Sequence, residues 1–423
     1  MRTVATVACP TRRGDDAHRS AAPRLHGLDA LRAGALLLGI VLHSLLPFDP
    51  AADWLVADER SSALAAVAVS VIHLFRMSLF MLLAGYFGRL VLHRRGWSRY
   101  LGDRLLRIGL PFVVFWPLAV LPLWPLMVLD ARLRGAPDPA PRAAAHPLLA
   151  LPPGQLWFLL VLLQSVLIVL IVRALILAVI GPRRAARSAE WAGRLLAAPL
   201  GVLPAAVPYW AALLRQGTVD GGIAAPAALA PDLAALTAYA GAFTVGWALQ
   251  ADPGALRRIA RSWPAHLTAA VGTTVPALLA AGPGAPLPLS AAVTAVAGWS
   301  WVYALLGICV RFLHAERPAI RYLADASYWM YLTHLPLLIA IEIPLARLDL
   351  PIAVKLAATW LAAGAALVAG YHLLVRSTPV GHWLNGHRYP FRPLQAPWRN
   401  DARRIRPASP AAPHRPRGLD RAP

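Results

Sequence analysis

The chain has 423 residues, and 41 basic against 20 acidic side chains give a formal net charge of +21. Only 14% of the residues are charged and 58% are hydrophobic, whereas about a quarter of the residues in soluble domains are charged. This composition excludes a soluble globular protein and a disordered one, and it argues against a β-barrel, whose alternating segments give a weaker hydropathy signal. The sequence therefore predicts an all-α polytopic membrane protein.

Apolar stretches close to the length of a membrane-spanning helix recur along most of the chain. Residues 1–24 lack the apolar core of a signal peptide, and we expect them to form a disordered cytoplasmic tail. An Arg- and Pro-rich segment over 376–423 predicts a second, largely extended cytoplasmic tail. Between the tails we predict a transmembrane domain of residues 25–375 with ten helices, at 28–48, 64–88, 106–129, 156–180, 196–214, 233–250, 263–281, 289–312, 323–345 and 352–375.

The placement of the basic residues predicts that both termini lie inside. With that orientation, only seven of the 41 fall in outer segments, namely Arg60, Arg132, Arg134, Arg142, Arg215, Arg347 and Lys355. This bias is the one that the positive-inside rule describes, and we expect a multi-pass protein of the inner (plasma) membrane. Topology and contacts with anionic membrane lipids explain the basic charge without a nucleic-acid partner.

The first outer connection, residues 49–62, is acidic and indicates a short solvated loop. The two cysteines, Cys9 and Cys309, have no metal-ligand spacing, so we expect neither a metal site nor a disulfide framework.

Two ionisable side chains share one face of the first predicted span. Such groups cost roughly 3 kcal/mol or more in lipid, so each needs a partner, a cavity or a function. Arg32 and His43 are eleven residues apart, which puts them on one helix face, about 16 Å apart along the axis. Taken singly, Arg32 fits a snorkelling topology anchor paired with Asp29, and His43 fits a hydrogen-bonded interior histidine. Together they favour a polar cavity that enters the membrane.

The second and ninth predicted spans carry the other polar groups that we single out. His73 and Arg76 are one turn apart, and Arg76 lies near mid-membrane, where it needs a buried anion, a dipole or a structural partner. Tyr328, Tyr331 and His334 step by three along one side of the ninth span. An aromatic pair at this spacing is usually packing, but the histidine in the same line needs a polar neighbour.

Five motifs, in order and at consistent depths, resemble the membrane acyltransferase-3 family, especially its branch containing glucan-biosynthesis protein C. The resemblance covers residues 24 to 375. One departure is Ala84, because the family usually has a small hydroxyl residue before the glycine of the second span. The motifs are Gly27–Arg32 followed after ten residues by His43, Leu74–Tyr86, Arg104–Pro111 with its Arg-x2-Arg-Ile-x2-Pro pattern, Leu156–Leu159 and Tyr328–Pro336.

The resemblance implies transfer of an acetyl or succinyl group from cytoplasmic acyl-CoA to a hydroxyl of a cell-envelope carbohydrate or glycolipid. Acyl-CoA is then a co-substrate, and no bound cofactor is expected. His43 is the expected base or transient acyl carrier, and His334 is the competing base. Arg76 would stabilise the oxyanion or hold a substrate carboxylate. Arg32, Arg104 and Arg107 lie near the inner face, where the CoA phosphates would enter, and Arg32 is also counted with the catalytic residues. His73, Trp157, Tyr328 and Tyr331 are the expected substrate-binding groups.

Two other function classes stay open. One is a transporter or flippase for a sugar-linked or lipid substrate, although the sequence lacks a mid-span carboxylate and matching interrupted segments in two halves. The other is a membrane scaffold with a degenerate site, against which the intact spacing of Arg32 and His43 argues.

Overall fold

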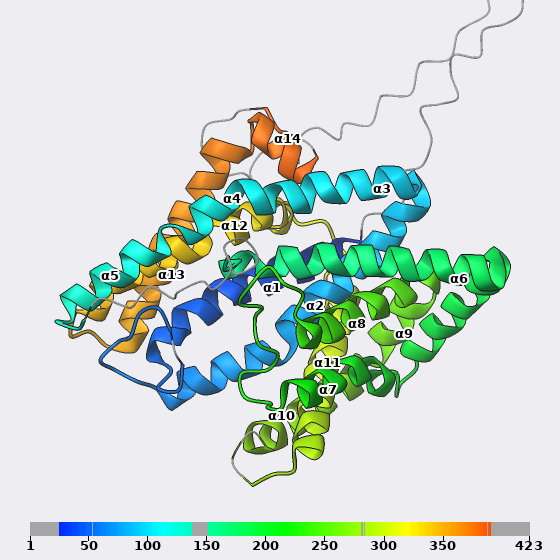
Figure 1. The fold of residues 1–423 in the computed structure, drawn as a ribbon, viewed down its shortest axis with the longest axis horizontal. Helices are drawn as coiled ribbons and strands as arrows, with labels where there is room; N and C mark the ends of the chain where they lie inside the picture. The colour runs from blue at the N-terminus through cyan, green and yellow to red at the C-terminus, as the bar shows by residue number, and fades with distance from the viewer. Residues whose placement is uncertain are drawn as a thin grey trace, which may run out of the picture.

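A computed structural model describes residues 25–52, 54–137, 151–280, 282, 284–386 and 388–390. Within these residues the regular structure is entirely helical (Figure 1). The predicted N-terminal tail and residues 391–423 lie outside them. The elements are α1 (His26–Leu45), η2 (Leu46–Phe48), α2 (Ala63–Arg95), α3 (Trp97–Arg104), η3 (Leu105–Gly109), α4 (Leu110–Val120), α5 (Leu123–Leu133), η4 (Gly154–Leu156), α6 (Trp157–Leu196), α7 (Val202–Gln216), α8 (Leu233–Ala251), α9 (Ala255–Arg261), α10 (Trp263–Ala280), α11 (Leu287–Phe312), α12 (Pro318–Ala346), α13 (Ile352–Gly370), η5 (Tyr371–Val375) and α14 (Pro379–Asn385).

Every predicted span coincides with a helix, but fewer helices qualify as membrane spans than we predicted. Among the described residues, seven helical runs are long and apolar enough to cross a membrane. Three predicted spans, which correspond to α7, α8 and α10, are not among the seven. With 15 residues, α7 is shorter than the roughly 20 residues that cross a bilayer. The chain is thus a helical membrane protein, and ten spans with both termini inside remain a prediction.

Two segments outside the predicted spans are helical. After the kink at Gly181, where Pro182 removes a backbone donor, α6 continues to Leu196, so the Arg-rich segment 183–194 is helix and not loop. The predicted extended tail is also wrong for residues 379–385, which form α14. Side-chain caps define other boundaries, since Ser62 and Asp232 accept hydrogen bonds from the backbone at the starts of α2 and α8.

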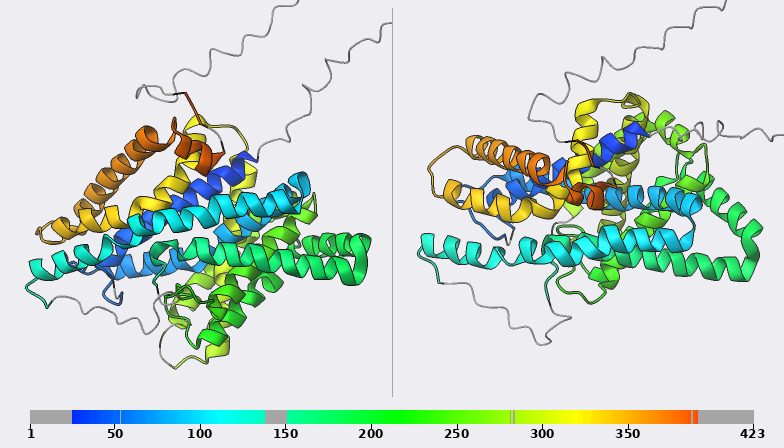
Figure 2. Two further views of the ribbon diagram at one scale, coloured as in Figure 1. Left: turned by 45° about the horizontal axis from the view of Figure 1, so that its top comes forward. Right: turned by 90° about the horizontal axis from the view of Figure 1, so that it is seen from above.

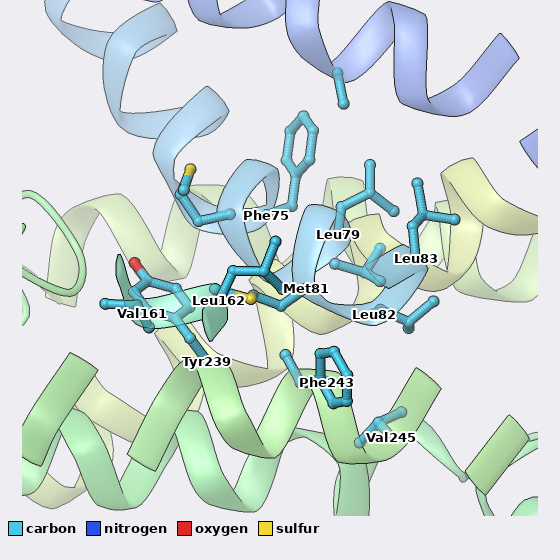
Figure 3. Packing of buried hydrophobic residues seen from close by; sticks show 14 of the residues in the cluster. Phe75, Leu79, Met81, Leu82, Leu83, Val161, Leu162, Tyr239, Phe243 and Val245 are labelled. Atoms are coloured by element: carbon cyan, nitrogen blue, oxygen red, sulfur yellow. The ribbon is translucent and has the colours of Figure 1, made fainter. Parts of the chain in front are cut away.

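Helices α2 and α8 pack against each other at close range. A Cβ at Gly85 of α2 would collide with the carbonyl of Phe243, and a Cβ at Gly246 of α8 would collide with the carbonyl of Leu82. Reciprocal glycines therefore let the two backbones touch, as small residues do between membrane helices. Figure 3 shows the apolar side chains around this contact, which come from α2, α6 and α8 and include Phe75, Leu79, Met81, Val161, Leu162 and Val245.

Helices α1 and α12 run parallel and in register, and this arrangement positions the site. Near their starts, Arg32 Nη2 donates a hydrogen bond to the Ala324 carbonyl at 3.2 Å. Eleven and ten residues further on, the rings of His43 and His334 lie 5.3 Å apart. The helical run α3–α5 and the first part of α6 extend along the same side of the molecule (Figures 1 and 2). Helix α4 of this run packs on α12, and α6 packs on η3.

Candidate active site

One cavity of about 1380 Å³ lies between α1, α2, α6 and α12, and residues of η3, α4 and α5 complete its wall. The five motifs, which are far apart in the sequence, all contribute to its lining. All ten site residues predicted from the sequence line it, namely Arg32, His43, His73, Arg76, Arg104, Arg107, Trp157, Tyr328, Tyr331 and His334. Ala84, the departure from the family pattern, also lines it.

The cavity extends along α1 and α12 for much of their length. At one end the lining includes Arg32, Arg104, Arg107 and Asn385 of α14. The lining also includes three connections between helices, within residues 52–55, 152–155 and 221–227. Because Arg32 and His43 are about 16 Å apart along α1, the cavity joins a basic end to a histidine pair.

The two histidines differ in their surroundings. His334 Nδ1 is 2.8 Å from the carbonyl oxygen of Tyr331, and since a carbonyl only accepts, Nδ1 carries the hydrogen and the neutral ring keeps Nε2 as a proton acceptor. The His43 ring stacks on Trp54 with centroids 5.3 Å apart and an interplanar angle of 16°. His43 Nδ1 is buried and has no hydrogen-bond partner among the described residues. Both histidines therefore remain candidates for the base.

Arg76 faces the cavity without a carboxylate partner in the described part of the chain. Its Nε has no hydrogen-bond partner among the residues that the structure describes, and its Nη2 is 3.6 Å from Met77 Sδ. Gly39 of α1 makes room for this side chain, because a Cβ there would collide with Arg76 Nη1. One turn earlier, His73 Nδ1 is also buried, and no described residue is hydrogen-bonded to it. A guanidinium held in this way can stabilise a negative charge on a ligand or on a reaction intermediate.

The basic end is organised by Asp103, which sequence reasoning missed. Asp103 Oδ1 forms an ion pair with Arg107 Nε at 2.9 Å, and Oδ2 lies 4.0 Å from Arg104 Nη2. Arg104 also lies over the Tyr100 ring, 4.9 Å from its centroid. Arg107 belongs to η3, a π-helical turn of the kind that is frequent at functional sites. The four-residue spacing from Asp103 to Arg107 was the available sequence signal.

Arg32 is both paired with Asp29 and exposed to the cavity. Its Nη2 lies 3.8 Å from Asp29 Oδ1, which is the pairing expected of a topology anchor. The same side chain lines the cavity. The ion pair is partly exposed on both sides, with 41% and 31% of the side chains accessible, so it leaves the guanidinium available to a ligand.

The tyrosines of α12 tie this helix to its neighbours. The Tyr328 hydroxyl donates to the Arg107 carbonyl at 2.7 Å, and the Tyr331 hydroxyl donates to the Gln155 carbonyl at 2.7 Å. Both tyrosines line the cavity, but their hydroxyl protons are engaged with backbone. Their contacts therefore support a positioning role.

The first outer connection is not the solvated loop that its acidic sequence indicated. Trp54 is half-buried on His43, and Val56 is 1% exposed. Asp58 is buried in an ion pair with Lys355 at 2.6 Å. The apolar residues Trp54 and Leu55 within the acidic stretch were the signal that the connection folds back onto the helices.

Comparison with known proteins gives the same assignment over most of the chain. A family model described as an acyltransferase domain, Acyl_transf_3, matches residues 25–375. Proteins named Glucans biosynthesis protein C from Salmonella paratyphi B, Salmonella heidelberg and Salmonella agona are 32% identical to the chain over 142 residues. The match covers 33% of this chain and 37% of each relative, so the chain matches little more than a third of the length of these relatives. No solved structure shows a significant match.

Proposed function

The chain belongs to the membrane acyltransferase-3 family, and from this premise we propose that it moves an acetyl or succinyl group from acyl-CoA to a hydroxyl of a cell-envelope carbohydrate or glycolipid, in the inner membrane. The observation that carries the proposal is the cavity that joins the histidine pair, Arg76 and the basic end. The name of the relatives, Glucans biosynthesis protein C, supports a carbohydrate acceptor.

The basic end of the cavity has the charge needed to bind the acyl-CoA donor. Acyl-CoA carries several phosphate groups, and arginine makes strong charge-assisted contacts with phosphate oxygens. Arg104 and Arg107 line this end with guanidinium groups that Asp103 only partly neutralises. Under the predicted topology this end faces the cytoplasm, where acyl-CoA is made, and the thioester would lie deeper, towards His43.

The histidine pair provides a base for the transfer of the acyl group. The acceptor hydroxyl oxygen attacks the thioester carbon, and its proton passes to a neutral imidazole nitrogen of His43. The new C–O bond forms, the C–S bond breaks, and the same proton returns to the departing sulfur to give the free thiol of CoA. If His43 is an acyl carrier, the acyl group moves first to its nitrogen and then to the hydroxyl oxygen.

Arg76 is placed to offset the charge that develops during this step. Attack on a thioester moves negative charge onto the carbonyl oxygen, and a fixed donor in a water-poor site is most effective there. Arg76 has no carboxylate among the described residues to neutralise it. A substrate carboxylate, as in a succinyl group, is the other anion that this guanidinium would accept.

Family membership favours this reaction over the transporter and scaffold alternatives. The test uses purified protein in lipid nanodiscs with acetyl-CoA or succinyl-CoA and a glucan oligosaccharide. We expect release of CoA thiol and a matching mass increase on the oligosaccharide. Mass spectrometry of envelope glycans from a deletion strain identifies the native product. Absence of both thiol release in vitro and a lost ester in the deletion strain would refute the proposal.

A further inference from the structure

Gln155 has an unusual environment, and the proposed acyl transfer gives this residue no role. It lies in η4, just before α6, and it lines the cavity. The residue is 7% exposed, and neither its Nε2 nor its Oε1 has a hydrogen-bond partner within the described residues. Buried amides are almost always hydrogen-bonded, so a buried amide that faces a cavity with both atoms free indicates a ligand.

The backbone holds this side chain in a fixed place relative to α12. Gly154, directly before it, has a φ of +54°, and a Cβ there would lie only 2.8 Å from Val120 Cγ2. A glycine is therefore needed for this turn. The Gln155 carbonyl accepts the hydrogen bond of the Tyr331 hydroxyl at 2.7 Å. Because Tyr331 is one turn from His334, the amide is anchored to the helix that carries one of the two candidate bases.

The hydrogen-bonding groups of an amide limit the classes of ligand that can satisfy both its nitrogen and its oxygen. The amide donates through Nε2 and accepts through Oε1, and a sugar hydroxyl also does both. A thioester carbonyl or a phosphate oxygen only accepts and would leave Oε1 unsatisfied. Nearby, the Trp157 and Tyr239 rings line the same cavity with centroids 5.6 Å apart. Aromatic walls with a few fixed polar groups are typical of sites for small organic ligands.

The position of Gln155 also separates it from the donor end. The Gln155 backbone is hydrogen-bonded to Tyr331, one turn from His334 on α12, whereas Arg104 of α3 and Arg107 of η3 line the basic end. We infer that Gln155 is a hydroxyl-binding residue of the acceptor subsite and orients a carbohydrate acceptor for attack. This inference rests on the proposed function. Within it, the amide holds a hydroxyl next to the reacting one and does not take part in bond making.

The test compares Gln155→Leu with the wild-type protein in nanodiscs, with acetyl-CoA as donor and a glucan oligosaccharide as acceptor. The apolar side chain keeps much of the volume but neither donates nor accepts. We expect the KM for the oligosaccharide to rise about tenfold, the effect of roughly one lost hydrogen bond. The KM for acetyl-CoA and the slow hydrolysis of the thioester without acceptor should not change. Gln155→Glu, which keeps an accepting oxygen but loses the donors, should fall in between.

Gln250→Leu is the matched control, because this half-buried glutamine at the end of α8 does not line the cavity. The same variants, at equal protein levels in cells, report on the native acceptor through the ester content of envelope glycans. A raised KM for acetyl-CoA with an unchanged acceptor KM would overturn the inference and assign Gln155 to an amide of the pantetheine arm. Unchanged kinetics and ester content would also overturn it.

Failure of the proposed function has a different signature, since the wild-type protein would then form no ester in vitro or in cells. A variant that loses monodispersity in detergent is replaced by Gln155→Asn, which keeps the amide on a shorter side chain. We expect Gln155→Asn to raise the acceptor KM alone, and donor kinetics that change instead would count against the subsite.

Discussion

Replacing His43 by alanine gives the sharpest test of the active site. We expect transfer to fall by 10²–10⁴-fold, the usual range for loss of a general base, which corresponds to about 2.7–5.4 kcal/mol of transition-state stabilisation. His334 Nε2 remains as a proton acceptor, but its ring centroid is 5.3 Å from that of His43. A base must come within about 3 Å of the proton it takes, so the predicted loss requires that the acceptor hydroxyl lies within this distance of His43 and not of His334.

The assay is transfer from acetyl-CoA at saturating acceptor, with His334→Ala compared at the same protein level. His314→Ala is the matched control, because this exposed histidine follows α11 and lies outside the cavity. Loss of the ring stacked on Trp54 should destabilise the fold by about 1–3 kcal/mol at most, which thermal unfolding in detergent will report. Near-normal activity of His43→Ala together with inactive His334→Ala would refute the assignment and identify His334 as the base.

Three further predictions concern the donor end, the topology and a buried ion pair. Arg32→Lys keeps the charge but loses the planar fork, so the KM for acyl-CoA should rise about tenfold; wild-type donor kinetics would mean that Arg32 is only an anchor. Reporter fusions after Pro50 and after Arg392 should report outside and inside, respectively, and an outside signal at Arg392 would contradict the even number of spans. Lys355→Ala should lower stability by about 3–5 kcal/mol, because it leaves Asp58, 2% exposed and 2.6 Å from the ammonium, without its counter-charge. Lys355→Met combined with Asp58→Leu should recover most of the lost thermal stability, and failure to do so would place the loss in packing.

Several features of the site could be predicted because they depend on one helix at a time. The placement of Arg32 and His43 on one face follows from helix geometry alone, and both side chains line the cavity. The cost of a charge in lipid singled out Arg76 before any neighbour was known. Side chains that the bilayer penalises must face the protein interior, so the other predicted site residues also line the cavity.

The features that were missed depend on contacts between segments. Gln155 and Trp54 lie in connections, where no hydropathy period applies, and their packing on α12 and His43 places them at the site. The sequence of α7 likewise does not decide whether this helix spans the membrane, since a short apolar stretch can be a buried helix or a span.

Local sequence thus determined the helical membrane fold and the polar faces of single helices, because hydropathy and the 3.6-residue period act within one helix. Tertiary structure decided which faces meet. Close approach through Gly39, Gly85 and Gly246, and the parallel register of α1 and α12, depend on the fit of side chains from distant segments. That fit brings His43 beside His334 and places Arg76 in the same cavity.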